Sequence, residues 1–270
     1  MTGQTTGPVL WEIDARGVAT VTFNRPEVNN AYDGTLLESL LATLDALDGA
    51  RGVRAVLIKG KGKHFQAGAD LRWIDAVRRA SPDENLRASH AIAEAVRRLN
   101  AFPVPTVALV QGACFGGGTG IVAACDIVVA AEDALFSITE VRWGLTPAPI
   151  VPQLVDAIGV RQLRRYALTG ERFGAEEARR LGLAHLVVPL ADLAREGARI
   201  VDQLLQNGPR AMAETKAWIL RSAWVDLDDA AFTALVESHA VRRQSSEAAE
   251  GLASFAEKRT ARWQKESPAL

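Results

Sequence analysis

Short apolar runs alternate with helical stretches over the first two thirds of the chain, and this pattern constrains the fold most. The apolar runs lie at residues 17–23, 55–59, 106–110 and 126–130, and leucines at helical spacing occupy residues 33–47. Repeated strand–helix–strand units predict a largely parallel sheet with helices packed against it. We therefore expect an α/β fold.

The last third of the chain has a different pattern. From about residue 191 onward, apolar positions recur only at helical spacing. The expected helices lie at residues 191–207, 209–221, 228–238 and 246–257. We accordingly divide the chain into an α/β core over residues 1–190, which would hold the active site, and a helical region over residues 191–270.

The charge balance excludes several classes of partner. The chain has 31 Lys and Arg residues against 32 Asp and Glu residues, which gives a net charge of −1. No overall basic field is available to attract nucleic acid or an anionic membrane surface. We therefore expect neither nucleic acid nor a membrane as a partner, and a polyanionic ligand would need a local group of Arg and Lys side chains.

The apolar segments and the two cysteines favour a cytoplasmic location. Residues 1–10 lack both the basic region and the apolar region of a signal peptide. Residues 106–131 are the most apolar, but three adjacent glycines and Asp126 favour an interior segment over a membrane span. Cys114 and Cys125 have no Cys or His cluster nearby, so we expect buried free thiols, and neither a zinc site nor a disulfide.

Two glycine-rich junctions are the candidate binding elements. One is His64–Leu71, which follows a strand, and the other is Gln111–Gly120, between a buried strand and a helix. Glycine lets a ligand approach the backbone, and the unpaired N–H groups at the start of a helix favour an anion. Neither junction has the spacing of a dinucleotide-binding turn or a P-loop. From the residues alone, an anion or oxyanion site and simple tight packing are both open.

Six motifs together resemble the crotonase superfamily, which is the enoyl-CoA hydratase/isomerase family. They occur in that family's order and spacing over about residues 10–265. The motifs are Asn24–Pro26, Ala67–Leu71, Gly116–Gly118, Ala124–Asp126, Phe136–Leu145 and Leu168–Phe173. The resemblance implies a ClpP/crotonase-like ββα-superhelix core, a C-terminal helical region used for oligomerisation, and a homotrimer or hexamer.

The resemblance also implies an acyl-CoA substrate and an oxyanion hole. The backbone N–H groups of Ala69 and Gly117 would polarise the thioester carbonyl, so that the α-carbon can carry enolate charge. Both donors are fixed before reaction, and two aligned donors in a dry pocket stabilise a transition state by several kcal/mol. Coenzyme A would enter as part of the substrate, so we expect no separate cofactor and no metal.

Further substrate contacts follow from the same resemblance. Arg25 and Arg72 are expected to contact the nucleotide end of CoA. The backbone from Gln66 through Ala67 to Asp70, together with Gly116, is expected to line its path. Asp70 has a second interpretation, as the cap of the helix that follows it.

Hydratases of this family use two glutamates that lie twenty residues apart. The corresponding positions here are Gly120 and Glu140, so one of the two carboxylates is absent. We expect Glu140 to be the acid–base residue, with a pKa raised by an apolar pocket; an ordinary surface carboxylate is the alternative. The residues considered as substitutes for the missing glutamate are Tyr32, His64, Gln66 and Thr119.

Three functions are consistent with one glutamate. Hydration of an enoyl-CoA is favoured, because residues 112–120 and 140–165 look most like bacterial proteins of the methylglutaconyl-CoA hydratase type, in which a glycine at the first position is familiar. Double-bond isomerisation, which a single base can perform, is the second. The third is a CoA-thioester-binding protein without hydratase activity.

Overall fold

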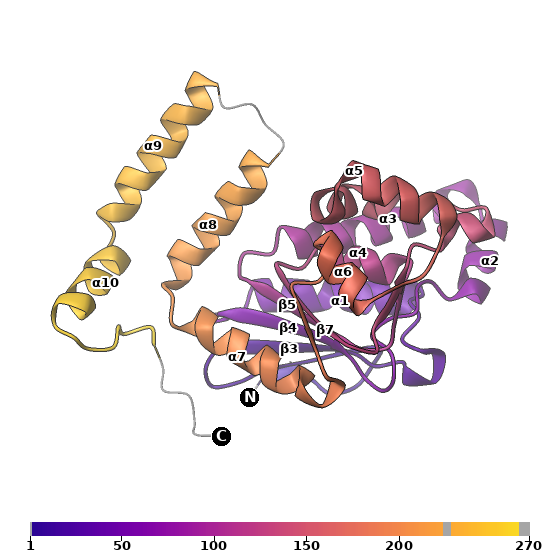
Figure 1. The fold of residues 1–270 in the computed structure, drawn as a ribbon, viewed down its shortest axis with the longest axis horizontal. Helices are drawn as coiled ribbons and strands as arrows, with labels where there is room; N and C mark the ends of the chain where they lie inside the picture. The colour runs from indigo at the N-terminus through magenta and orange to yellow at the C-terminus, as the bar shows by residue number, and fades with distance from the viewer. Residues whose placement is uncertain (1, 224–227, 265–270) are drawn as a thin grey trace.

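The computed structural model describes residues 2–223 and 228–264, and its core is built on a seven-stranded sheet (Figure 1). The strands are β1 (Thr2–Gln4), β2 (Val9–Ile13), β3 (Val18–Phe23), β4 (Ala55–Gly60), β5 (Thr106–Val110), β7 (Ile127–Ala131) and β10 (Leu186–Val188), and this is also their order in the sheet. Strands β1, β2 and β3 pair antiparallel, and β3, β4, β5, β7 and β10 pair parallel. The largely parallel sheet predicted from the sequence is thus confirmed.

Helices cover both faces of this sheet. Alternate residues of each strand point to opposite faces. Side chains such as Ala108 and Val128 pack in the main core with α1 (Gly34–Asp48), α3 (Pro82–Asn100), α4 (Gly117–Ala123) and α5 (Val151–Thr169). Their neighbours Val107 and Val129 pack on the other face against α7 (Leu193–Leu205). Strand β5 is buried along its whole length because both its faces are covered.

Local signals set the beginnings of two helices near the site. The Asp33 carboxylate accepts a hydrogen bond from the Leu36 N–H and caps α1. Ser81 and Glu84 form a capping box at the start of α3, in which each side chain bonds the other residue's backbone N–H. Between them in the chain lies α2 (Leu71–Arg79), the helix expected after Asp70, and it has no fully buried residue.

A second, smaller sheet brings the two glycine-rich junctions together. It consists of β6 (Ala113–Phe115), β8 (Leu135–Ser137) and β9 (Phe173–Gly174), and α6 (Ala175–Leu181) follows it. Isolated β-bridges join Gln66 to Cys114 and Tyr32 to Ala69. The first junction therefore lies directly beside the second, with the segment around Tyr32 on its other side.

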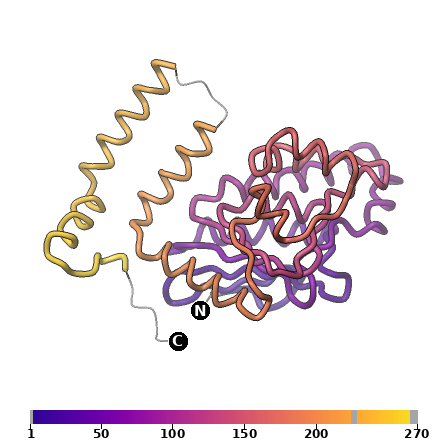
Figure 2. Tube along the Cα trace, viewed as in Figure 1, coloured from indigo at the N-terminus to yellow at the C-terminus, as the bar shows by residue number. Residues whose placement is uncertain are grey.

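The expected helices after residue 190 fall into two groups. Helix α7 packs on the sheet, whereas α8 (Pro209–Ser222), α9 (Asp229–Arg243) and α10 (Ser246–Ala256) extend away from it, as the orange and yellow parts of Figure 2 show. We call these three helices the C-terminal arm. Helices α8 and α9 are joined by a hydrogen bond from Trp218 Nε1 to Ser238 Oγ, 2.9 Å long.

Two further expectations concern the apolar segments and the cysteines. Within residues 2–223 and 228–264, no helix has the length and apolar character needed to cross a membrane. The most apolar segment, residues 106–131, contains β5, β6, α4 and β7. Cys114 and Cys125 are buried free thiols, as predicted, and burial raises the pKa of both.

Candidate functional site

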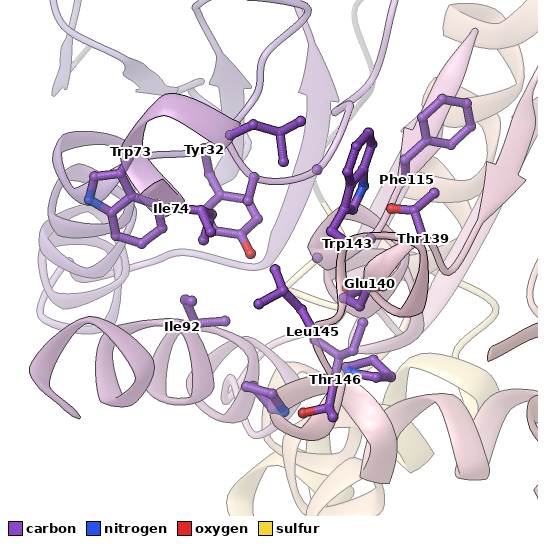
Figure 3. A pocket seen from close by; sticks show the side chains of 18 of the residues that line it. Tyr32, Trp73, Ile74, Ile92, Phe115, Thr139, Glu140, Trp143, Leu145 and Thr146 are labelled. Carbon is purple, nitrogen blue, oxygen red and sulfur yellow. The ribbon is translucent and has the colours of Figure 1, made fainter. Parts of the chain in front are cut away.

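A pocket of about 770 Å³ opens between α2, α3, the start of α4 and the segment that follows β8 (Figure 3). Its wall includes Ala67, Ala69, Gly116, Gly117 and Glu140. Both glycine-rich junctions and the predicted acid–base residue thus meet at one cavity. Most of the exposed wall is apolar, so charge that develops inside is poorly screened by water.

Ala69 has an N–H group that the protein does not use. The neighbouring groups are occupied: the Gly68 N–H donates to Gln66 Oε1 at 2.9 Å, and the Asp70 N–H donates to the Tyr32 carbonyl at 2.8 Å. No acceptor for the Ala69 N–H is present in the part of the chain that the structure describes. These flanking bonds hold the peptide in place while leaving one donor free for a ligand.

Gly117 supplies the second donor, at the first position of α4. Such an N–H has no acceptor inside its own helix. Gly116 before it has φ +50° and ψ −124°, which is a conformation suited to glycine. The Gly116 N–H donates to the Ser137 carbonyl at 2.8 Å, and its carbonyl accepts from the Thr119 N–H and hydroxyl. The turn is therefore rigid, and Gly117 N–H is a donor fixed beforehand.

Glu140 lies beside this turn, at the start of a short 3-10 helix (Glu140–Trp143). A β-carbon placed on Gly116 would lie 3.2 Å from Glu140 Oε1. The other carboxylate oxygen, Oε2, is buried and has no hydrogen-bond partner among the described residues. Burial raises the pKa of Glu140, although backbone hydrogen bonds at Glu140 and Thr139 partly oppose the rise. A carboxylate with these properties is suited to proton transfer.

The position of the missing glutamate is closed by Ile150. A β-carbon on Gly120 would lie 2.2 Å from Ile150 Cγ2 and 2.6 Å from Ile150 Cβ. Ile150 is 2% exposed and ends a second 3-10 helix (Ala148–Ile150). No side chain fits at residue 120 unless Ile150 moves, so this wall of the pocket is apolar and Glu140 has no second carboxylate opposite it.

Four of the expected substrate contacts lie behind the pocket wall or outside it. Gln66 is fully buried, and its side chain supports the Gly68 peptide. Arg25 pairs with Asp33 at 2.9 Å and lies 3.8 Å from Asp70, so it joins the capping residues of α1 and α2. Asp70 caps α2 by accepting from the Arg72 N–H. The Arg72 side chain is exposed and does not line the pocket.

Aromatic residues line the pocket at positions that the sequence did not single out. Trp73, on α2, packs edge-on against Tyr32 with ring centroids 5.9 Å apart. Phe115 lies under the Arg172 guanidinium group at 5.4 Å. Trp143 is 59% exposed at the pocket mouth. The only hint that the sequence gave of Trp143 was its place within the Phe136–Leu145 motif.

The four polar residues considered as substitutes for the missing glutamate have different surroundings. His64 Nδ1 accepts a hydrogen bond from the Ala113 N–H at 2.9 Å, and Thr119 Oγ1 donates to the Gly116 carbonyl at 2.6 Å. Neither side chain lines the pocket, and Gln66 lies beneath the wall. Tyr32 does line it, and Figure 3 shows its hydroxyl group pointing into the cavity.

No metal site accompanies these groups in the described residues. Within residues 2–223 and 228–264, no cluster of three or more His, Cys, Asp or Glu side chains has the arrangement needed to hold a metal ion. The described groups that line the pocket include backbone N–H donors and the Tyr32 hydroxyl, which could donate hydrogen bonds, and the Glu140 carboxylate, which could accept a proton.

Known proteins resemble the chain over nearly its whole length. A family model described as enoyl-CoA hydratase/isomerase matches residues 14–266. A Thermus thermophilus protein, provisionally named an enoyl-CoA hydratase, is 34% identical over 252 residues, which are 93% of this chain and 99% of that protein. Hydroxycinnamoyl-CoA hydratase-lyase from Pseudomonas fluorescens is 31% identical over 235 residues, which are 82% of this chain and 83% of that enzyme. The crystal structure of an enoyl-CoA hydratase from Shewanella pealeana matches with a TM-score of 0.92 at 34% identity, over 96% of this chain and 97% of that one.

Proposed function

Since the chain belongs to the enoyl-CoA hydratase/isomerase family, within the crotonase superfamily, we propose that it adds water to the double bond of a 2-enoyl-CoA. The predictions of the family, of an enzyme and of an α/β crotonase fold are confirmed by the same comparisons. The reaction and its substrate are the proposal. The expected closeness to methylglutaconyl-CoA hydratases stays a prediction.

One observation carries the proposal: a buried carboxylate and two fixed N–H donors, for which the described residues offer no acceptor, line the same largely apolar pocket. The thioester oxygen would accept hydrogen bonds from Ala69 and Gly117. These donors stabilise the oxygen most when it becomes negative, so they lower the barrier to enolate formation. Coenzyme A would be held as part of the substrate.

A single carboxylate is sufficient for the proton transfers. Glu140 would take a proton from water while the water oxygen bonds to the β-carbon and the π electrons move to the α-carbon and the thioester oxygen. The protonated Glu140 would then give its proton to the α-carbon. Water is consumed, and the carboxylate returns to its starting state. The raised pKa of Glu140 favours both half-steps near neutral pH.

Isomerisation is the second candidate, and the contact between Gly120 and Ile150 favours it. With an isoleucine where a second carboxylate would lie, Glu140 would move a proton from one substrate carbon to another with no water involved. Binding without turnover is a third outcome. The hydratases among the relatives favour hydration.

Incubation of the purified protein with a 2-enoyl-CoA and, separately, a 3-enoyl-CoA tests the proposal. Loss of the conjugated thioester absorbance together with formation of a 3-hydroxyacyl-CoA supports hydration. Conversion of the 3-enoyl-CoA alone would overturn hydration in favour of isomerisation. Binding of both esters without any product would leave only the binding function.

A further inference from the structure

Hydration by one carboxylate requires a second polar group that holds the water. A bound water molecule needs at least two polar partners to be oriented. Glu140 provides one of them. On the side of residue 120 the wall is the apolar side chain of Ile150, so the second partner has to come from elsewhere in the pocket.

Tyr32 has the required position. Its ring covers Gly117: a β-carbon on that glycine would lie 2.6 Å from Tyr32 Cε1 and 3.2 Å from Tyr32 Oη. Its backbone is bridged to Ala69. The hydroxyl group is therefore close to the Gly117 N–H. The main chain of the same residue is hydrogen-bonded to Gly68 and Asp70, on either side of the Ala69 N–H.

The Tyr32 hydroxyl is also unoccupied. None of the described residues forms a hydrogen bond with Oη, although the side chain is only 8% exposed and its ring is held by Trp73. The side chains of His64 and Thr119 are hydrogen-bonded to backbone groups, and Gln66 is buried beneath the pocket wall. Of the four substitutes suggested by the sequence, only Tyr32 presents a polar atom to the cavity.

We propose that the Tyr32 hydroxyl donates a hydrogen bond to the water molecule that Glu140 activates, and so positions its oxygen for attack on the β-carbon. This inference rests on the proposed hydration. The water accepts from Tyr32 and donates to Glu140. Its proton passes to Glu140, its oxygen bonds to the β-carbon, and the phenol keeps its own proton throughout.

The electrostatics of the pocket agree with a donor that does not ionise. Burial raises the pKa of Tyr32, and the nearby charge of Glu140 raises it further. A phenol whose pKa is raised above its ordinary value is neutral near pH 7, so it can donate a hydrogen bond but does not compete with Glu140 as a base.

Tyr32→Phe tests the proposal, because it removes the hydroxyl and leaves the ring over Gly117. Two rates are measured: hydration of a 2-enoyl-CoA, and exchange of the α-protons of a saturated acyl-CoA with deuterium from the solvent. Exchange needs the oxyanion donors and Glu140 but no attacking water. We expect kcat for hydration to fall about 10- to 100-fold, with KM and the exchange rate changed less than about 3-fold.

Tyr166→Phe is the matched control, since the chain has only two tyrosines. Tyr166 is buried outside the pocket, and its hydroxyl donates to Glu177. This variant should retain both rates. An equal fall of hydration and exchange in Tyr32→Phe would overturn water positioning, and so would an unchanged hydration rate. If the unmodified protein exchanges α-protons but hydrates no enoyl-CoA, the proposed function itself fails, whatever Tyr32 does.

Discussion

The pocket and the C-terminal arm are built in opposite ways. Around the pocket, side chains pack so closely on glycine backbone that no β-carbon fits, as at Gly117 under Tyr32 and Gly120 under Ile150. In the arm, large apolar side chains such as Phe232 and Phe255 are exposed. One region is held by close packing, and the other presents apolar surface that the described part of the chain leaves exposed.

A few polar contacts tie the arm to the core. Lys216 on α8 pairs with Asp126 at 2.7 Å, at the beginning of β7. Arg54, next to β4, donates to the Trp263 carbonyl at 2.8 Å, beyond α10. The difference between the regions suggests separate tasks: chemistry depends on backbone positions in the core, whereas the arm is placed by anchors and offers an apolar face.

The largest expected effect is at Glu140. Glu140→Gln keeps the shape of the side chain but removes the base, so we expect kcat to fall about 10²- to 10⁴-fold for hydration. Proton exchange at the α-carbon should fall as well, because both reactions use the same carboxylate. Unchanged turnover would contradict the role of Glu140 and remove the chemical distinction between core and arm.

The pH dependence of Glu140 has a definite sign. Because burial raises its pKa and the base must be ionised, kcat should fall as the pH decreases through a value above the ordinary carboxylate range. The ionised form is also less favourable in the folded chain than in the unfolded one. Its contribution to stability is therefore present at low pH and lost as the pH rises through the raised pKa. At pH 7 the Tm of Glu140→Gln should therefore equal or exceed the Tm of the unmodified protein. Any difference between the two Tm values should become smaller at acid pH.

The next effect concerns close packing at Gly120. In Gly120→Ala the new β-carbon meets Ile150, and we expect a loss of about 1–3 kcal/mol in the free energy of unfolding, measured by denaturant titration. Ile150→Ala alone leaves a cavity. The double variant should lose less than the sum of the two single losses, by about 1 kcal/mol. If the two single losses in the free energy of unfolding add up to the loss of the double variant, the proposed contact between residues 120 and 150 is contradicted.

A smaller effect is expected at the anchor of the arm. Lys216→Met removes the ion pair, but Asp126 keeps hydrogen bonds from the Thr106 N–H and hydroxyl and is partly exposed. We expect a loss of about 1–2 kcal/mol. Amide hydrogen exchange should accelerate in α8 and change little in α4. Acceleration in α4 instead would show that the core depends on the arm.

The smallest effect on the single chain is expected at Phe255, which is 86% exposed. Phe255→Ser should change its stability by less than about 0.5 kcal/mol. The homotrimer or hexamer implied by the family resemblance is still a proposal, and the apolar face of the arm supports it. Sedimentation of the unmodified protein and of this variant tests it, because a shift toward smaller species is expected only if the face is an interface.

The sequence was informative where one residue and its near neighbours determine the structure. Strand β5 matched its predicted range, residues 106–110, because an uninterrupted apolar run needs cover on both sides. Helix α5 was not predicted, and its backbone is non-helical at Gly159, where the helical pattern is interrupted. The local glycine signals likewise indicated where a ligand could approach the backbone.

Contacts between distant segments were not accessible in the same way. Nothing local to Ile150 indicates that it covers Gly120, thirty residues earlier in the chain. Similarly, Gln66 is polar and lies within a binding motif, yet it is buried because its side chain supports the Gly68 peptide. The sequence therefore indicated which backbone groups would line the pocket, but not which side chains would form the wall around them.

The contact between Ile150 and Gly120 has a consequence for how this chain can change over generations. A mutation that introduces glutamate at residue 120 alone would place the new side chain against Ile150, whereas a mutation that shortens Ile150 alone would leave a cavity in this wall. A second carboxylate at residue 120 therefore requires both changes together.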